Sequence, residues 1–212
     1  MSAKTKLLRM TSALNTYKQS RREWAINILA AVYWAIYAMA YLQRSLSSRD
    51  FMSLGLGAYY SLVVWLFITR EPAKRSASWP VTIFVLCSMI LPVIGLAPSS
   101  QGFPVLGGFA QGLGLIGMFA ATASLGRSFA IAPADRGLRT NGLYRWIRHP
   151  LYASELLFYV GYLLANWSWR NGLVLIVAVI FVMIRIHLEE QLIEGYQQYA
   201  ERVRWRLIPR VW

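Results

Sequence analysis

The sequence predicts an all-α membrane protein with about six transmembrane helices, and three observations support this prediction. Apolar residues make up 57% of the 212 positions and charged residues only 15%, which is far from the composition of a typical soluble domain. Hydropathy divides the chain into six apolar segments. Lys and Arg outnumber Asp and Glu by 22 to 9, and these cations lie mainly between the apolar segments. Such a charge distribution is typical of membrane-protein loops, so no nucleic-acid partner is expected.

Four apolar segments have the length of a full membrane span, since about 20 helical residues cross roughly 30 Å of hydrocarbon. They cover residues 24–42, 51–69, 79–97 and 103–125. Within the last of them, a small-residue face is predicted to let a neighbouring helix approach closely. It is formed by Gly108, Gly112, Gly114 and Gly117.

The last two apolar segments, residues 151–167 and 172–188, are shorter and are joined only by residues 168–171. They are predicted to form a tight helical hairpin, followed by a cytoplasmic amphipathic C-terminal segment. Residues 1–125 then form a scaffold that gives access to an acceptor, and residues 126–212 form the catalytic region of one integrated membrane domain.

The basic residues predict the topology, because cytoplasmic loops collect Lys and Arg. With both termini in the cytoplasm, only Arg44, Arg49 and Arg170 fall on the opposite side. The polar segment 1–22 lacks a signal-peptide pattern, so the first span is expected to remain. A bacterial inner membrane and an endoplasmic reticulum membrane both fit, and the missing targeting segment favours the former. The N-terminal basic residues and those of 202–210 are expected to contact anionic lipid headgroups.

Polar chemistry concentrates in two places that the hairpin brings to one membrane face. The first is the long connection 126–150, and long loops of this kind are often functional. The second is the end of the sixth segment, where Arg185 and Glu189 lie on one helix face at i, i+4. Taken alone, this spacing equally fits a local ion pair at a helix end. Cys87 is the single cysteine, so neither an internal disulfide nor a cysteine metal cluster is expected, and no metal is predicted.

Together these residues resemble the isoprenylcysteine carboxyl methyltransferase superfamily, which includes the phospholipid N-methyltransferases. The resemblance covers about residues 138–209. Its elements are Arg148-His149-Pro150-Leu-Tyr152, then Arg185-x-x-x-Glu189-Glu190, then Gly195-Tyr196-x-x-Tyr199-x-x-x-Val203 and Pro209. Ser154 stands where that pattern often has glycine. Membrane sterol reductases carry an element similar to the first, usually with Asn where this chain has Leu151, and they lack the paired glutamates.

The resemblance implies S-adenosylmethionine as the cofactor, converted to S-adenosylhomocysteine and bound in a cytoplasmic pocket of the last two helices, the preceding loop and the tail. Arg185 would face the transfer centre. The residues implied to bind the cofactor are His149, Pro150, Tyr152, Glu189 and Glu190, with the backbone around Gly142 and Tyr144.

The chemistry of the side chains agrees with this implication. Glu189 or Glu190 can accept hydrogen bonds from an ammonium or from ribose hydroxyls, and the Tyr152 ring can face a cation. Arg185 can bind a carboxylate with two parallel hydrogen bonds. An amine or thiol acceptor would also need a base, for which Glu189 and His149 are candidates.

Glu155 lies inside a predicted span, where a carboxylate is costly and a functional role is the first hypothesis. It is expected either to line the acceptor pocket or to pair with Arg185. The predicted catalytic residues are therefore Arg185, Glu189 and Glu155. His187 projects from another side of its helix and is expected to pack at the interface.

We therefore predict an integral membrane methyltransferase that acts on a lipophilic small molecule or a lipid-linked acceptor within the bilayer. The methylated group is a carboxylate, an amine or a thiol. Two other readings remain: an NADPH-dependent reductase of the sterol type, and a small transporter or structural membrane protein without a cofactor.

Overall fold

The computed structural model describes the backbone of residues 3–212 and the side chains of residues 23–212, and it is 73% helical. Four helices are long and apolar enough to cross a membrane: Glu23–Ser48, Phe51–Thr69, Pro104–Ser128 and Trp169–Leu192. Two shorter apolar helices are Trp79–Gly95 and Pro150–Ala165. The prediction of a mainly helical chain is confirmed, and the four longer helices are candidate membrane spans. The chain divides into two compact units, Met1–Pro72 and Ala73–Trp212.

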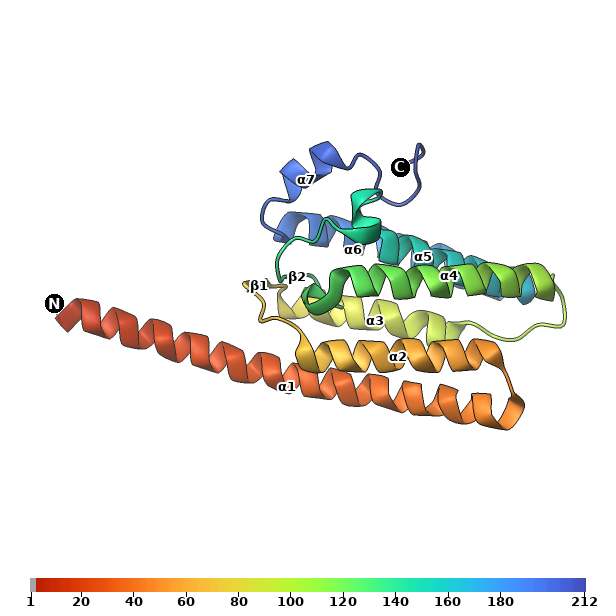
Figure 1. Ribbon diagram of the computed structural model, residues 1–212, viewed down its shortest axis with the longest axis horizontal. Coiled ribbons are helices and arrows are strands. Elements are labelled where there is room, and N and C mark those ends of the chain that lie inside the picture. The colour runs from red at the N-terminus through yellow and green to blue at the C-terminus, as the bar shows by residue number, and fades with distance from the viewer. Residues whose placement is uncertain (1–2) are drawn as a thin grey trace. The chain divides into compact units, whose positions relative to one another are not determined.

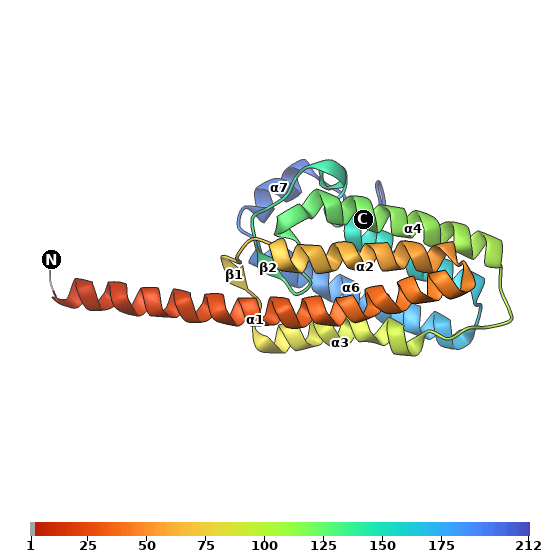
Figure 2. The same cartoon turned by 60° about the horizontal axis from the view of Figure 1, so that its bottom comes forward.

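The first unit is a hairpin of α1 (Ala3–Ser48) and α2 (Phe51–Thr69), which lie side by side in Figure 2. The α2 helix begins where the Asp50 side chain accepts a hydrogen bond from the backbone N–H of Met52 at 3.0 Å, as an N-cap should. Its predicted bounds are confirmed. The α1 helix extends beyond residues 24–42 at both ends, because hydropathy detects only the apolar part of a helix. The predicted lipid contacts of the basic residues before residue 23 lie outside the described side chains.

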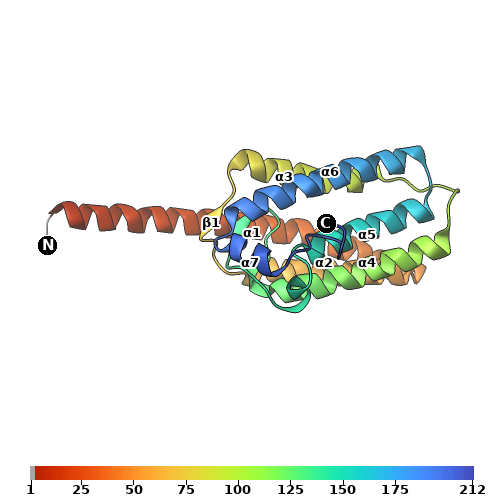
Figure 3. The ribbon, with the colours of Figure 1, turned by 90° about the horizontal axis from the view of Figure 1, so that it is seen from above.

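The second unit contains two helix pairs. The α3 helix (Trp79–Gly95) packs along α6 (Trp169–Leu192), and α4 (Pro104–Leu125) packs along α5 (Pro150–Ala165), as Figure 3 shows. The α5 and α6 helices follow one another in the chain and also contact each other; we call this pair the α5–α6 hairpin. The α6 helix runs three residues earlier and four residues later than the predicted segment 172–188. It therefore carries Glu189 and Glu190 within the helix.

Short elements join these helices at the hairpin's open end, which we define as the end that holds His149 and Glu190. Figure 1 shows α7 (Tyr196–Arg202) near the loop that contains η2 (Gly142–Arg145). A shorter 3-10 turn, η1 (Gly126–Ser128), follows α4. The two-residue strands β1 (Arg75–Ser76) and β2 (Ala134–Asp135) pair antiparallel. Buried Asp135 accepts a hydrogen bond from the backbone N–H of Gly137 at 3.0 Å.

Close packing of α4 on α5 depends on glycine, but only part of the predicted face takes part. A Cβ added at Gly107 would lie 2.4 Å from the backbone nitrogen of Ala165, and one at Gly114 would lie 2.7 Å from that of Phe158. A Cβ at Gly117 would meet the side chain of Ser154. By contrast, a Cβ on Gly108 or on Gly112 would meet nothing within 4 Å. The prediction for these last two glycines is wrong, because the helix turns them away from α5.

Polar groups also hold together the hairpin's other end, where α5 turns into α6; we call this the turn end. Asn171 is fully buried there. Its Oδ1 accepts from the backbone N–H of Ala97 at 3.0 Å, and its Nδ2 donates to the carbonyls of Ala97 at 2.9 Å and Asn166 at 2.7 Å. The backbone N–H of Ser99 donates to the Asn166 side chain at 3.2 Å. The loop between α3 and α4 is thereby fastened to the hairpin turn.

Candidate functional site

The loop before α5 and the tail after α7 pair through their backbones at the open end. The N–H of Arg148 donates to the carbonyl of Trp205 at 2.8 Å, and the N–H of His149 donates to that of Arg206 at 2.9 Å. Pro150 starts α5 at its first turn, where its missing N–H costs nothing. His149 is consequently held at the helix start with only 4% of its surface exposed.

Glu190 is the centre of a polar network at this end. Its Oε1 accepts hydrogen bonds from Tyr196 Oη at 3.0 Å, Arg206 Nε at 3.1 Å and Arg148 Nη1 at 3.2 Å. His149 Nε2 lies 3.2 Å from the same oxygen. The other oxygen, Oε2, accepts from Arg206 Nη2 at 3.0 Å. Both oxygens of Glu190 are therefore engaged by the chain itself.

Tyr196 links this carboxylate to the histidine, since its hydroxyl oxygen lies 2.9 Å from His149 Nε2. Burial raises the pKa of Tyr196 above its ordinary value, so the hydroxyl keeps its proton at neutral pH. A hydroxyl has one proton, and a carboxylate oxygen only accepts. When Tyr196 donates to Glu190, His149 Nε2 must therefore be the donor toward both oxygens.

A second group of side chains, the inner cluster, lies deeper between α5 and α6. Tyr152 Oη donates to Glu189 Oε2 at 2.9 Å, and the Arg185 guanidinium stands 4.7 Å from the centre of the Tyr152 ring. Arg185 Nη1 is 3.7 Å from Glu155 Oε2. Tyr159 Oη donates to Glu155 Oε1 at 3.1 Å. The inner cluster thus joins one cation to two carboxylates inside an apolar hairpin.

Arg185 is the least satisfied member of the inner cluster. Only 5% of its surface is exposed, and its Nε is buried with no hydrogen-bond partner among the described residues. Its contact with Glu155 exceeds hydrogen-bond length. Buried guanidinium donors normally find acceptors, because leaving them unpaired is costly. An acceptor from outside the chain could bind this nitrogen.

Glu189 differs from Glu190 in the same respect. The single hydrogen bond to its side chain within the described part of the chain comes from Tyr152 and reaches Oε2. Oε1 therefore remains able to accept. The structure brings the two predicted polar clusters together. Both oxygens of Glu190 are engaged by residues of the chain, whereas Glu189 Oε1 remains able to accept a hydrogen bond.

The remaining predicted site residues lie around these two carboxylates. Tyr144 is buried, and its carbonyl accepts from Tyr199 Oη at 2.6 Å. Gly142 has φ +57°, and a Cβ there would meet Ser124 Oγ at 2.2 Å, so the position requires glycine. His187 is exposed, and its Nε2 lies 2.9 Å from Gln191 Nε2. His187 thus makes a local contact and does not join the polar network.

Two sequence-based expectations change in the structure. Arg206, expected to contact lipid headgroups with the rest of residues 202–210, pairs with both oxygens of Glu190 instead. The local ion pair between Arg185 and Glu189 is replaced by a contact from Arg185 to Glu155 on α5. The alternative that Glu155 pairs with Arg185 is confirmed.

Sequence reasoning assigned no site role to Arg148, Tyr159, Tyr196 and Trp212. Arg148 and Tyr196 belong to the motif quoted above, and their place in it could have indicated a role in the site. The motif does not indicate that both contact Glu190. Tyr159 follows Glu155 by one helical turn, a spacing that could have suggested the hydrogen bond. No local pattern distinguishes Trp212 or marks Arg206 as inward-facing.

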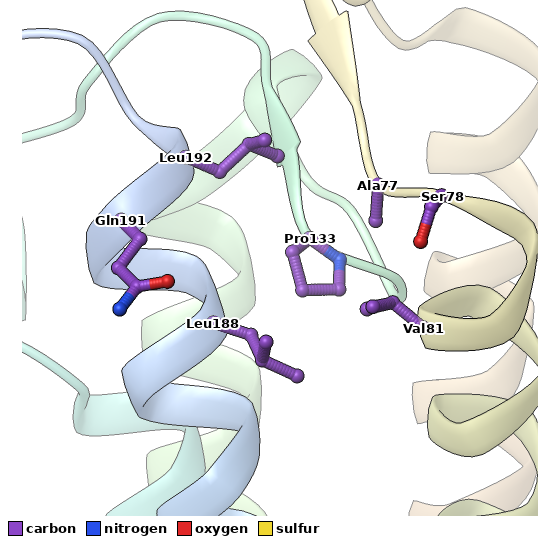
Figure 4. Close-up of a pocket in the computed structure, with 7 residues that line it drawn as sticks. All are labelled: Ala77, Ser78, Val81, Pro133, Leu188, Gln191 and Leu192. Atoms are coloured by element: carbon purple, nitrogen blue, oxygen red, sulfur yellow. The ribbon is translucent and has the colours of Figure 1, made fainter.

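A pocket of about 270 Å³ lies on another side of α6 (Figure 4). Its walls are mostly apolar, with Ser78 and Gln191 as the polar contributors. The complete lining consists of Ala77, Ser78, Val81, Pro133, Leu188, Gln191 and Leu192. It contains no ionisable side chain, so the polar chemistry of this unit lies in the two clusters instead. In the part of the chain described, no group of three or more His, Cys, Asp or Glu residues could hold a metal ion.

Comparison with known proteins identifies the family of this region. No curated protein matches the chain. Residues 104–201 match the family described as phospholipid methyltransferase. That range contains α4, α5, α6 and most of α7, and with them both glutamates, Arg185 and His149. The matched family is part of the superfamily of isoprenylcysteine and phospholipid membrane methyltransferases.

Proposed function

We propose that this protein transfers a methyl group from S-adenosylmethionine to a lipophilic or lipid-linked acceptor at the open end of the α5–α6 hairpin. The observation that carries the proposal is a pair of groups in the inner cluster with unused hydrogen-bonding capacity. The buried Nε of Arg185 has no partner among the described residues, and one oxygen of Glu189 is free to accept. Both lie in the segment that matches the methyltransferase family.

The residues present suit this cofactor. Its ammonium and ribose hydroxyls need an acceptor, which Glu189 Oε1 supplies, and Tyr152 holds that carboxylate in place through Oε2. When bound, S-adenosylmethionine supplies a methyl carbon on a cationic sulfonium, which a nucleophile attacks in line. The face of Tyr152 that was expected to meet a cation already carries Arg185. Glu189 therefore has the larger part in donor binding.

Arg185 would orient the acceptor. Its unused N–H groups can bind a carboxylate or another oxyanion, and the low-dielectric surroundings strengthen such a bond. Glu155 keeps the guanidinium directed into the cluster, with Tyr159 holding the other carboxylate oxygen. Most of the rate would come from alignment of donor and acceptor in a site shielded from water.

For an amine or thiol acceptor, Glu189 is the better candidate base. His149 Nε2 already donates toward Glu190 and Tyr196, so this nitrogen has no lone pair with which to take a proton. Glu189 can accept a proton without breaking the network around Glu190. A carboxylate acceptor needs no such base.

The membrane arrangement forms part of the proposal. We infer that α3 and α5 cross the membrane with the four longer helices, which places both termini and the open end on the cytoplasmic side and leaves Arg44, Arg49 and Arg170 on the other. A bacterial inner membrane fits this arrangement, as does the endoplasmic reticulum. Residues 1–125 would supply the scaffold and the acceptor's route, and residues 126–212 the catalytic region.

Calorimetric titration of S-adenosylhomocysteine into the purified full-length protein tests this function. Glu189→Gln should weaken the affinity about tenfold, because the acceptor of the hydrogen bond loses its negative charge. Glu201→Gln, an exposed carboxylate on α7, is the matched control and should bind as the wild type does. A folded wild-type protein that binds no S-adenosylhomocysteine would refute the proposal. Affinity for NADPH instead would favour the reductase, and affinity for neither would favour a transporter or structural protein.

A further inference from the structure

Arg206 lies beyond the family-matched segment, yet it makes the most extensive contact with Glu190. Its Nε and Nη2 reach the two oxygens separately, at 3.1 and 3.0 Å, which is the two-pronged geometry of a strong arginine–carboxylate pair. The hydrogen bond to Glu190 raises the pKa of Arg206, in agreement with a persistent ion pair.

The two oxygens of Glu190 are not equivalent. Oε1 is shared by Arg148, His149, Tyr196 and Arg206, whereas Arg206 is the single partner of Oε2 among the described residues. Neither oxygen lies on the axis of the last C–C bond, so bonds to one oxygen restrain the rotation of a carboxylate and a bond to the second oxygen restrains it further. A partner on each oxygen fixes its plane, and Arg206 alone supplies the second point.

Arg206 is itself held by the end of the tail. Its guanidinium lies 5.0 Å from the centre of the Trp212 ring, and the backbone N–H groups of Arg206 and Leu207 donate to the Trp212 carbonyl at 3.0 Å each. Trp212 packs against a buried cluster that includes Tyr152 and Ile186. The tail therefore connects Arg206 to the wall of the inner cluster.

We propose that Arg206 is a positioning residue of the donor site: it fixes the plane of Glu190, and Glu190 in turn orients His149 and Tyr196 at the start of α5. The assignment rests on the function proposed above. Arg206 touches no reacting atom. Its effect passes through the network to Tyr152, whose ring stacks on His149 with centres 5.6 Å apart, and so to Glu189.

Histidine NMR offers a test that does not depend on catalysis. The chain has only two histidines, so labelling the imidazole nitrogens gives two sets of ring signals, and His187→Asn assigns them. The first variant, Arg206→Met, removes both the positive charge and the two-pronged hydrogen bonding of the guanidinium. The second, Arg206→Lys, keeps the positive charge but not the two-pronged geometry. Arg210→Met removes an equal charge from an exposed side chain of the same tail and is the control.

Arg206→Met should shift the His149 ring signals, leave those of His187 in place and weaken S-adenosylhomocysteine binding about tenfold. Arg206→Lys should retain the fold and shift the His149 signals less, because it keeps the ion pair without the fork. Arg210→Met should change neither readout.

Unmoved His149 signals in a folded Arg206 variant, or unchanged affinity for S-adenosylhomocysteine, would overturn the assignment. A wild-type protein that binds no S-adenosylhomocysteine would refute the proposed function separately. The histidine signals would then still decide whether Arg206 orders this network.

Discussion

The two ends of the α5–α6 hairpin use polar groups in opposite ways. At the turn end, neutral amides form a closed set: Asn171 is completely buried, and the oxygen and the nitrogen of its side chain both bond to the chain. At the open end, charged groups predominate, and Arg185 keeps a buried nitrogen with no partner within the described residues.

This difference separates a structural fastening from the proposed binding site. A buried polar group whose bonds are all made within the chain stabilises one arrangement, and nothing remains for a ligand. A buried charge with unused donors costs stability and is retained where an external group completes it. Within the open end, Glu190 belongs to the first kind and Arg185 and Glu189 to the second.

The largest expected effect concerns Arg185 and Glu155. Arg185→Met should lower methyl transfer by roughly a hundredfold or more, and it should also destabilise the protein because it leaves Glu155 buried without its cation. The double variant Glu155→Gln/Arg185→Met should recover thermal stability but not activity. Activity and melting temperature in detergent measure both effects. Recovery of activity in the double variant would show that Arg185 is only structural.

A smaller effect is expected at the turn end. Asn171→Ala removes three hydrogen bonds and leaves the backbone groups of Ala97 unpaired, so the free energy of unfolding should fall by about 2–3 kcal/mol. Affinity for S-adenosylhomocysteine should be unchanged in the molecules that stay folded. Denaturant titration and calorimetry together make the measurement. A selective loss of affinity would mean that the two ends are coupled, against the division made above.

The glycines of α4 offer a matched pair. Gly107→Ala would place a methyl group against the α5 backbone and should cost about 1–3 kcal/mol of stability. Gly108→Ala, one residue on, meets open space and should be neutral or slightly stabilising in a helix. Melting temperatures of the two variants make the comparison. Equal values would contradict the close packing of α4 on α5.

The smallest effect is a pH dependence from Tyr196, whose pKa burial raises in the folded protein. Because the pKa of Tyr196 is higher in the folded protein, the side chain contributes its full stabilisation at pH values below its unfolded-state pKa of about 10. This stabilisation is lost as the pH rises through its folded-state pKa. The stability difference between wild type and Tyr196→Phe should therefore be constant from about pH 7 to 9 and shrink above about pH 10. Thermal unfolding across this range tests the sign, and a difference that grows with pH would contradict it.

Hydropathy predicted the helices well where apolar segments end sharply. The range 51–69 is confirmed at both ends, since Asp50 caps the helix at its start and the chain leaves helical geometry at Arg70. Hydropathy underestimated the lengths of α1 and α6, because both helices continue through polar residues. The two-residue strand pair was not predicted, because pairing between distant loops has no local signal.

The sequence alone predicted the class of this protein and a place for its chemistry. Apolar length predicts membrane-spanning helices, and the spacing of His149, Tyr152, Arg185 and the two glutamates predicts a catalytic region, because these are local properties of the chain. Only the tertiary structure decided which polar groups satisfy one another. Arg206 pairs with Glu190, Arg185 contacts Glu155, and Oε1 of Glu189 remains able to accept a hydrogen bond. These contacts depend on how the helices pack, because the partners are distant in the sequence.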